Sequence, residues 1–436
     1  MSFIHPYSDE ATSSELELFK IPSTVTAIES ARYFHYKPAE SLTSSNWIEF
    51  RVAGTEEFVD LSSLLLEVEL SVTLSDGQPL PGKAAATGSP TNLFDEITPV
   101  NNLLSSLFQQ FDLFLNNTLV TTATNLYHYR AYLDNLFYQS EKAKKTYMFP
   151  AFWEEDEGKR KQRFKRVYSG KTLKLLGPIH YDLGQQERLL LNFVDMNLRF
   201  NLADPSFCFT IGGNTTDRPK FSIINATLHV LKKRLFSDCE AGILQALGKQ
   251  SCKYFFTQTQ LRHRVIDSGS SSFFCDNLFP STLPRRFIIG LLPAKSFNGD
   301  YKSDAFSFSH NDLIDVKAFV DSIQTPVPSL ELDIDNDEYA RAYHLFYEAM
   351  NSIHPQATLS ITPDQFKSNS TFFAWTLSTE NDLDDSDTIG LIRRGHVRLD
   401  FRFSKPTTEQ IVVVIYSHFP QIIQIDSTRE VMIESV

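Results

Sequence analysis

Apolar and polar residues alternate strictly in several short stretches of the chain. Between Leu66 and Leu74 every even position is Leu or Val, and every odd position is Glu, Ser or Thr. A period of two is the pattern of a half-buried β-strand with one wet face. Similar alternation recurs at 111–115, 194–201 and 224–230. These stretches predict a first β-sandwich.

The pattern restarts after about Phe236. Residues 257–265 alternate again, and further strand signals occur at 286–292, 313–320, 371–377, 397–403, 411–416 and 421–426. Many short strands separated by turn signals are typical of antiparallel sandwiches. We therefore expect an all-β protein with a few inserted helices, divided into an N-terminal arm (1–30), a first sandwich (31–236), a linker (237–250) and a second sandwich (251–436).

Two segments have helical rather than strand spacing. Residues 125–138 and 336–350 place aromatic and apolar side chains three and four apart, and both lie between predicted strands. Long loops are predicted at 77–95, 151–171, 297–309 and 380–390, and loops of this length usually make contacts or carry function. The aromatic content of helix 125–138 and of loops 151–171 and 297–309 makes them the candidate interface elements.

Composition supports the β prediction. Aromatic residues make up 13% of the chain, with 36 Phe against 5 Met, and aromatic side chains suit the pleated surface of a sheet. A net charge of −12 argues against a sequence-independent coat on DNA, which needs excess cations to neutralise phosphates. This negative net charge favours protein partners.

The start of the chain and the cysteines point to a reduced, intracellular product. MSFIHPYSDE lacks the basic and apolar regions of a secretory signal, and no apolar run is long enough to span a membrane. The four cysteines form no CxxC pair and are expected to be buried thiols rather than disulfides or zinc ligands.

Motifs of catalysis and cofactor binding are missing from the sequence. It contains no P-loop, no GxGxxG, no HExxH and no GxSxG. The stretch 333–337 imitates the opening of a calcium loop but has Glu338 and His344 where that loop needs Gly and Glu, so a capped helix start is the better interpretation. The acidic run 382–387 is interpreted as a solvated loop tip. We expect no enzyme activity, no cofactor and no metal site.

A basic segment follows four consecutive acids at 154–157. Its candidate contact residues are Lys159, Arg160, Lys161, Arg163, Lys165 and Arg166. One interpretation places them against encapsidated nucleic acid or an acidic neighbour. The alternative is a solvated loop whose charge the adjacent acids compensate, and Trp153, Phe164 and Tyr168 suggest that the loop packs.

The N-terminal arm is acidic, so it cannot act as a cationic packaging arm. It carries apolar residues that we expect to dock on another protein as a strap, namely Leu16, Leu18, Phe19 and Ile21. The alternative is a frayed tail.

Several segments in order resemble one family. PVNNLLSSLFQQFDLFLNN at 99–117 is followed by NLYHYR at 125–130, AYLDNLF at 131–137 and EKAKK at 141–145. Together with ELELFKIPSTVTAIES at 15–30, this succession resembles the double jelly-roll major capsid proteins of Polinton/Maverick transposons and adintovirus-like elements. The resemblance covers about the first 200 residues strongly and the second half weakly. On physical grounds 99–117 is a turn of helix feeding a core strand, closed by a hairpin turn at Asn116 and Asn117.

The resemblance implies a hexon-like fold of two tandem jelly rolls and a structural function. It implies that three chains form a pseudo-hexameric homotrimer, that trimers contact neighbouring capsomers in an icosahedral shell, and that a minor penton protein fills the vertices. Direct contact with DNA is left open. The product would be made in the host cytoplasm and assembled inside the cell, with the nucleus as an alternative compartment, and would end in the virion.

Two other functions fit parts of the sequence. A tandem β-sandwich protein could instead bind or process carbohydrate, which would require paired carboxylates with aromatic platforms. A minor vertex protein would resemble a single jelly roll and be much shorter than this chain. Neither carboxylate spacing nor length favours these alternatives.

Overall fold

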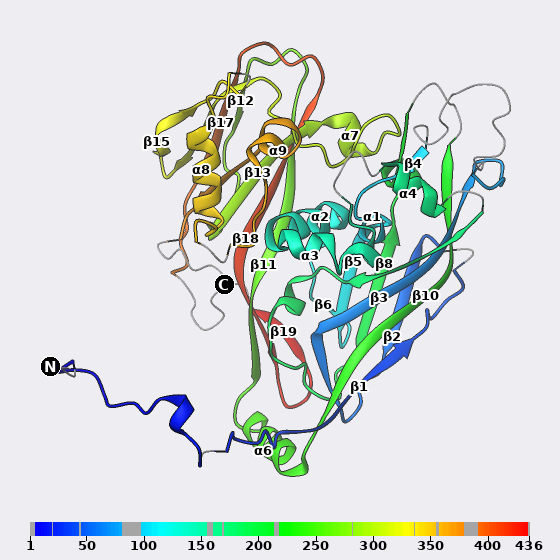
Figure 1. Cartoon of the computed structure of the whole chain (residues 1–436), viewed down its shortest axis with the longest axis vertical. Helices are drawn as coiled ribbons and strands as arrows, with labels where there is room; N and C mark the ends of the chain where they lie inside the picture. The colour runs from blue at the N-terminus through cyan, green and yellow to red at the C-terminus, as the bar shows by residue number, and fades with distance from the viewer. Residues whose placement is uncertain are drawn as a thin grey trace.

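The computed structural model of the chain consists mainly of antiparallel β-sheets, with helices gathered between them and at one end (Figure 1). The structure describes residues 5–19, 21–42, 45–80, 97–154, 160–167, 170–212, 218–280, 282–334, 336–354, 357–378 and 391–434. The predicted all-β class and the two antiparallel sandwiches are confirmed, and the predicted acidic tip at 382–387 lies outside the described residues.

The N-terminal strands form two four-stranded sheets that pack face to face. One has the order β1-β10-β3-β7 and the other β2-β8-β5-β6, and β4 pairs with β9 beside them. The strands are β1 (Ile28–Tyr36), β2 (Trp47–Val52), β3 (Phe58–Leu74), β4 (Ile97–Pro99), β5 (Phe108–Leu115), β6 (Thr118–Leu119), β7 (Thr172–Pro178), β8 (Met196–Leu202), β9 (Phe209–Ile211) and β10 (Pro219–Leu235). The even positions of β3 from 64 to 72 are buried, as the alternation predicts, because they form the inner face of their sheet.

The second pair of sheets is built from the C-terminal strands. Their orders are β11-β18-β13-β16, with β19 beside β18, and β12-β17-β14-β15. The strands are β11 (Cys252–Ile266), β12 (Ser272–Cys275), β13 (Arg286–Pro293), β14 (Leu313–Val320), β15 (Ile323–Glu331), β16 (Phe372–Thr376), β17 (Val397–Phe403), β18 (Ile411–Ile425) and β19 (Val431–Glu434). All strands of these two sheets follow α6, but the exact boundaries assigned to the arm, sandwiches and linker from the sequence stay predictions.

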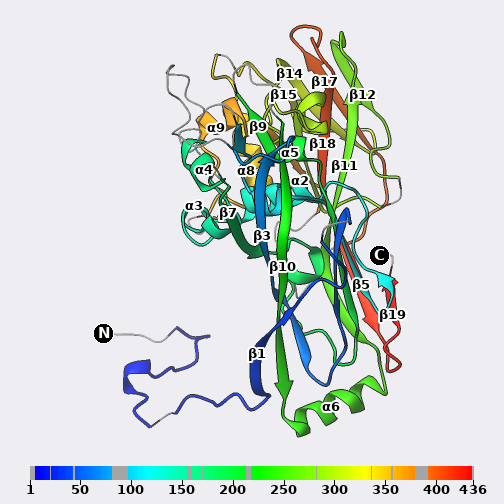
Figure 2. The same ribbon diagram turned by 90° about the vertical axis from the view of Figure 1, so that its right-hand side faces the viewer.

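Helices connect the strands. They are η1 (Ser14–Leu16), α1 (Leu103–Ser106), α2 (Tyr127–Tyr138), α3 (Glu141–Lys145), η4 (Phe149–Ala151), α4 (Arg160–Val167), η6 (Asp182–Gln185), α5 (Pro205–Cys208), α6 (Ser237–Leu247), α7 (Ala294–Asn298), α8 (Ala340–Ala349) and α9 (Pro363–Ser368). Helix α6 joins β10 to β11 at one end of the molecule, where the N-terminal arm also leaves it (Figure 2).

The segment 99–117 folds as predicted, whereas the strand near the C-terminus does not. The segment 99–117 folds as a helical turn, α1, that leads into β5, and Asn116 and Asn117 adopt positive φ angles of 44° and 68° in the hairpin to β6. The predicted break between strands 411–416 and 421–426 is wrong, since β18 is continuous. On one side β18 pairs with β13 up to His418 and with β19 from Ile422, so Pro420 sits in the gap, where no ladder bond is required.

Alanine substitutions at two glycines, Gly290 and Gly242, are expected to change the stability in opposite directions. A Cβ on Gly290 in β13 would lie 2.6 Å from Cδ1 of Phe308 and 2.8 Å from Cε1 of Phe372. We expect Gly290→Ala to lower the free energy of unfolding by about 1–3 kcal/mol through overpacking. In exposed α6 a Cβ on Gly242 meets nothing within 4 Å, so Gly242→Ala should raise the free energy of unfolding by about 1 kcal/mol. Chemical denaturation measures both, and a loss in Gly242→Ala would contradict the geometry.

Candidate functional surfaces and the junction

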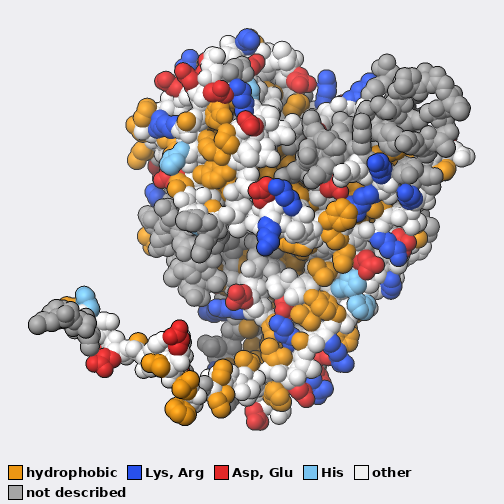
Figure 3. All heavy atoms as spheres, viewed as in Figure 1, with side chains coloured by type: hydrophobic (Ala, Val, Ile, Leu, Met, Phe, Trp, Pro, Cys, Tyr) orange, Lys and Arg blue, Asp and Glu red, His pale blue; other side chains and the backbone are white. Residues whose placement is uncertain are grey.

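The N-terminal arm projects from the body, with hydrophobic side chains along it (Figure 3). The predicted strap residues Leu16, Leu18, Phe19 and Ile21 are 67%, 78%, 97% and 87% exposed. Side chains of this size are normally buried, because leaving one in water forfeits about 1.5–3 kcal/mol. The structure therefore places these four residues where another molecule can reach them; their docking stays a prediction.

The basic segment is partly a helix rather than a loop. Residues 160–167 form α4, so the predicted continuous loop at 151–171 is wrong. Phe164 and Val167, three positions apart, are buried and hold the helix against the body. Lys159 lies outside the described residues, and so do the side chains of Arg160 and Lys161. Lys165 is exposed, whereas Arg163 and Arg166 are half-buried, so contact of this segment with nucleic acid or a neighbour stays a prediction.

Arg166 packs inside the chain. Its guanidinium carbon lies 4.4 Å from the ring centre of Phe149 and 4.2 Å from that of Phe152, and one nitrogen is 3.7 Å from Oε1 of Glu154. Burial lowers the pKa of Arg166, and the Glu154 carboxylate opposes that shift. Of the basic side chains predicted to reach outward, this one stabilises the first sandwich.

Because Arg166 is packed and Lys165 is exposed, alanine substitutions at these adjacent positions should differ in their effect on stability. Arg166→Ala is expected to lower the free energy of unfolding by about 1–2 kcal/mol, because it removes two cation–π contacts and the packing of the side-chain stem. Lys165→Ala, at the exposed adjacent position, should change it by less than about 0.5 kcal/mol. Equal effects in a urea titration would show that Arg166 makes no such contribution.

Helix α2 does not lie where its aromatic content predicted. It was expected at an interface between molecules, yet all residues from Tyr127 to Phe137 are buried within this single chain. The helix lies between the two sandwiches (Figure 1). We call the buried region around it the junction. An element already covered by its own chain has no surface left for a partner.

Aromatic rings from both sandwiches surround α2 at the junction. Tyr129 stacks on Phe297 at 5.3 Å between ring centres, and Tyr132 stacks on Phe306 at 4.1 Å. Phe137 meets Phe372 edge-on at 5.1 Å. The aromatic residues of 297–309 thus pack inward, like those of α2. Part of the aromatic content therefore joins the two sandwiches to each other, where such pairs add about 0.5–1.5 kcal/mol each beyond burial.

A buried charge network also crosses the junction. Arg130 of α2 donates to Asp182 Oδ1 at 2.6 Å and to Asp134 Oδ2 at 3.3 Å. The second sandwich joins through the Thr259 backbone N–H, which donates to Asp182 Oδ1 at 2.9 Å, and the Tyr416 hydroxyl, which donates to Asp134 Oδ1 at 2.7 Å. Burial alone would lower the pKa of Arg130, but Asp182 and Asp134 outweigh it and raise that pKa.

Two histidines lie beside this network. Asn135 Nδ2 lies 3.2 Å from Nε2 of His180, and the Tyr138 hydroxyl lies 3.4 Å from Nε2 of His418. Both histidines line a cavity of about 400 Å³ at the junction, together with Asp134 and Tyr138. The ionisable side chains around this cavity are hydrogen-bonded or ion-paired with other groups of the junction. This arrangement is typical of a structural network.

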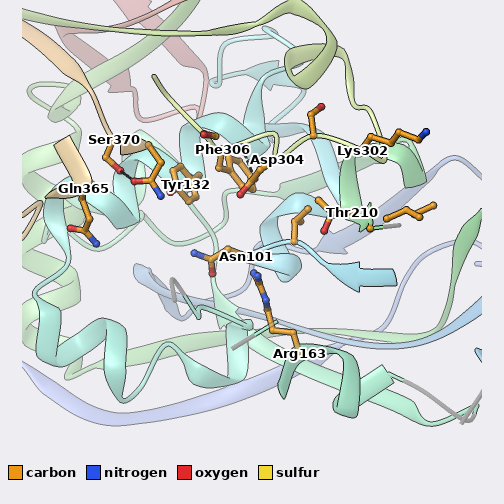
Figure 4. A pocket seen from close by; sticks show the side chains of 15 residues that line it. Asn101, Tyr132, Arg163, Thr210, Lys302, Asp304, Phe306, Gln365 and Ser370 are labelled. Carbon is orange, nitrogen blue, oxygen red and sulfur yellow. Dashed lines mark hydrogen bonds between the residues drawn. The ribbon is translucent and has the colours of Figure 1, made fainter. Parts of the chain in front are cut away.

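A second, polar pocket of about 260 Å³ lies between the halves (Figure 4). Arg163 points into it from α4 toward Asn101, while Gln365 and Ser370 come from another wall. Among the described residues that line it, Asp304 is the one carboxylate, whereas glycoside hydrolysis generally uses two. The stacked rings of Tyr132 and Phe306 are both buried and offer no open platform. The pocket gives the carbohydrate-processing alternative no support.

The part of the chain that the structure describes contains neither a metal-binding cluster nor a membrane-spanning helix. Among the described residues, no three His, Cys, Asp or Glu side chains are grouped to hold a metal ion. Asp335 of the calcium-like stretch lies outside those residues, and Asp333 accepts a hydrogen bond from Asn336 instead. In the same part of the chain, no helix is long and apolar enough to cross a membrane.

Comparison with known proteins gives a relative and a fold. No protein-family model matches the chain. It is 24% identical over 440 residues to the uncharacterised protein F54H12.2 of Caenorhabditis elegans, covering 95% of this chain and 100% of that protein.

Among solved structures, a chain of the Sputnik virophage superposes with a TM-score of 0.65 at 11% identity, covering 99% of this chain and 94% of its own. The mavirus major capsid protein gives 0.53 at 12% identity, covering 100% and 95%. The chain shares the double jelly-roll fold of viral capsid proteins.

Proposed function

We propose that the chain is a structural major capsid protein. The observation that carries this proposal is the pairing of two jelly rolls through a packed junction in one chain, a fold that capsid proteins share over nearly its full length. Support also comes from the sequence resemblance to Polinton/Maverick and adintovirus-like capsid proteins, which are encoded by elements of animals. The relative that matches over its full length is likewise from an animal, a nematode.

In the proposed assembly, three chains form a homotrimer. Three times two jelly rolls give six similar units, so the trimer mimics a hexagon and tiles an icosahedral face. Contacts within the trimer should be permanent and bury on the order of 2,000 Å² or more. Contacts between neighbouring capsomers should be smaller, more polar and sensitive to salt.

The remaining surfaces receive roles in this assembly. The apolar arm residues Leu16, Leu18, Phe19 and Ile21 act as a strap on a neighbouring molecule, since they are exposed in the single chain. The exposed part of α4 faces nucleic acid or an acidic neighbour. A penton protein occupies the vertices, and assembly takes place inside the host cell before the protein resides in the virion.

The oligomeric state tests the proposal directly. The chain, expressed alone at high concentration, is expected to have three times the monomer mass by light scattering, and negative-stain microscopy should show hexagonal particles or shells. Raising the salt concentration should dissolve shells into trimers before trimers into monomers, because the contacts between trimers are the more polar ones. A strict monomer at high concentration would overturn the proposal.

A further inference from the structure

Helix α6 is an apolar helix that its own chain leaves mostly uncovered. It contains no Lys or Arg, and of its eleven residues, all within the described part of the chain, only Leu247 is buried. Cys239 and Ile243 are partly buried, because they face the body. Ala241 and Leu244 lie on the side that faces solvent.

Two further apolar side chains extend this exposed surface where the chain enters α6. Phe236, the residue before the helix, is 46% exposed, and Ile28 at the start of β1 is 38% exposed, while Leu244 is 44% exposed. Hydrophobic side chains gather at this end of the body, from which the arm leaves (Figure 3). We call Ile28, Phe236, Ala241 and Leu244 the base patch. Grouped exposed apolar side chains of this kind mark a contact with another molecule.

The N-terminal arm starts beside the base patch. The backbone N–H of Phe236 donates to the Ala27 carbonyl at 3.2 Å, which fixes the root of the arm next to the start of α6. From there the arm leads away from the helix, as Figures 1 and 2 both show, and its own apolar side chains are exposed. The single chain therefore leaves both the arm and the base patch uncovered.

Rotational symmetry brings the arm of one copy to the base patch of another. A rotation about an axis keeps every element at its height along that axis. Because the arm starts beside α6 in each copy, it also starts at the level of α6 in the other copies of the same ring. Residues 5–27 span at most roughly 75 Å when extended, which is enough to cross to a neighbour.

Positive charges lie at the C-terminal end of α6. Lys249 follows the helix and Lys253 comes four positions later, and both are exposed. Arg188 adds a third cation there, since its Nη1 donates to the Lys253 carbonyl at 2.7 Å. An acidic segment is therefore attracted to this end of the helix.

The arm has the complementary pattern. Glu15 and Glu17 alternate with Leu16 and Leu18, so the arm, when extended, directs acids to one side and leucines to the other. Apolar side chains can then meet the base patch while the glutamates meet the cations beside it.

A membrane surface is the poorer partner for α6. Helices that lie on membranes carry Lys and Arg along their polar face. Helix α6 has neither, and its first turn holds Asp238 and Glu240. Anionic lipid headgroups repel these acids.

We infer that the base patch is the docking surface for the N-terminal arm of a second copy of the chain. The inference rests on the proposed function and deepens it, because it names the surface on which the strap lies. The leucines of the arm cover the base patch, and its glutamates face the two lysines that follow α6.

Photo-crosslinking of the full-length chain tests the inference. Benzoylphenylalanine in place of Phe19, which is exposed in the single chain, reports what the arm touches. A crosslink between copies gives a product of twice the chain mass on a denaturing gel, whereas a crosslink within one copy does not. We expect the larger product, and mass spectrometry should place its crosslink in residues 236–247. Crosslinks within one copy only, or crosslinks to other elements, would overturn the inference.

Peptide binding measures the same contact in solution. The full-length chain carries Leu16→Ser and Leu18→Ser, which weaken its own arm, and a labelled peptide of residues 10–24 is added. Fluorescence anisotropy should show binding that Leu244→Ser weakens by about tenfold or more. Ile323→Ser, at an equally apolar and exposed position in β15, is the matched control and should leave the affinity unchanged.

Charge reversal separates specific docking from general stickiness. Lys249→Glu should weaken peptide binding, and Glu17→Lys in the peptide should restore part of it, because the two changes recreate an attractive pair. All of these positions are exposed, so the melting temperatures of the protein variants should equal that of their parent. Equal peptide binding to Leu244→Ser and to its parent would contradict the inference.

Light scattering on the same samples distinguishes this inference from the capsid proposal. Trimers or shells that show neither crosslinks nor peptide binding at α6 would refute the inference alone. A strict monomer would refute the capsid proposal, and the peptide would then decide whether the base patch binds the arm. Binding of the chain to phosphatidylserine vesicles that Leu244→Ser abolishes, without peptide binding, would assign the patch to a membrane and overturn the arm as its occupant.

Discussion

Replacing Asp182 by alanine is expected to lower the free energy of unfolding by about 3–5 kcal/mol. The carboxylate accepts from Arg130 at 2.6 Å and from the Thr259 backbone N–H at 2.9 Å, and all three groups are buried at the junction. Removing one partner of a buried ion pair leaves the other charge desolvated and incompletely compensated. The Thr259 N–H also loses its acceptor, which adds to the cost.

Urea titration of the unassembled chain measures this effect, and the exposed pair Lys367–Asp337 supplies the control. Asp337 is 73% exposed in that pair, at 2.8 Å, so Asp337→Ala should cost less than about 1 kcal/mol. If the two variants lose similar stability, the junction network does not hold the sandwiches together. Because Asp182 bonds to elements of both sandwiches, its loss should also reduce the cooperativity between them.

Lowering the pH from 7 to 5 is expected to destabilise the fold through three buried histidines, by about 4 kcal/mol from His128 and His180 together and further through His418. Burial lowers the pKa of His128 to about 3 and that of His180 to about 4, although Asp134 opposes the second shift. The pKa of His418 falls well below its usual value because of burial and the nearby charges of Arg286, Arg130 and Arg285.

The sign follows from proton linkage. Each histidine binds its proton more readily in the unfolded chain, so its stabilising effect is complete above about pH 6.5 and is lost as the pH falls toward the folded pKa. At pH 5 the solution is about 1.5 pH units below the unfolded pKa, which corresponds to about 2 kcal/mol each for His128 and His180; His418 contributes in the same direction. The sum is comparable with the whole stability of a typical domain, so unfolding or opening of the junction should begin near that pH.

Denaturant unfolding at pH 7, 6 and 5 and constant ionic strength checks this dependence. His180→Gln should reduce the slope of stability against pH, by about 2 kcal/mol between pH 7 and pH 5. His354→Gln, at an exposed position outside the junction, should leave the slope as it is. A profile that is flat between pH 7 and 5 would be incompatible with three neutral buried histidines.

Local patterns predicted most of the secondary structure. The alternation at 66–74 identified β3, and the change of period near Gln109 separated α1 from β5. Helix α4 was missed because its eight residues are mostly Arg, Lys and Gln, with Phe164 and Val167 as the only apolar signal. A pair of apolar residues three apart gives too little periodicity to distinguish a packed helix from a charged loop.

The sequence alone determined the β class, the helical character of α2 and the acidic–apolar alternation of the arm, because strand and helix periods and charge depend on neighbours in the chain. Only the tertiary structure decided that the aromatic residues of α2 join two sandwiches and that its charge network bonds to the second of them. Those properties arise from residues more than a hundred positions apart, such as Asp134 with Tyr416, which no local period connects. A period shows which face of an element is buried, whereas its partner depends on how the whole chain packs.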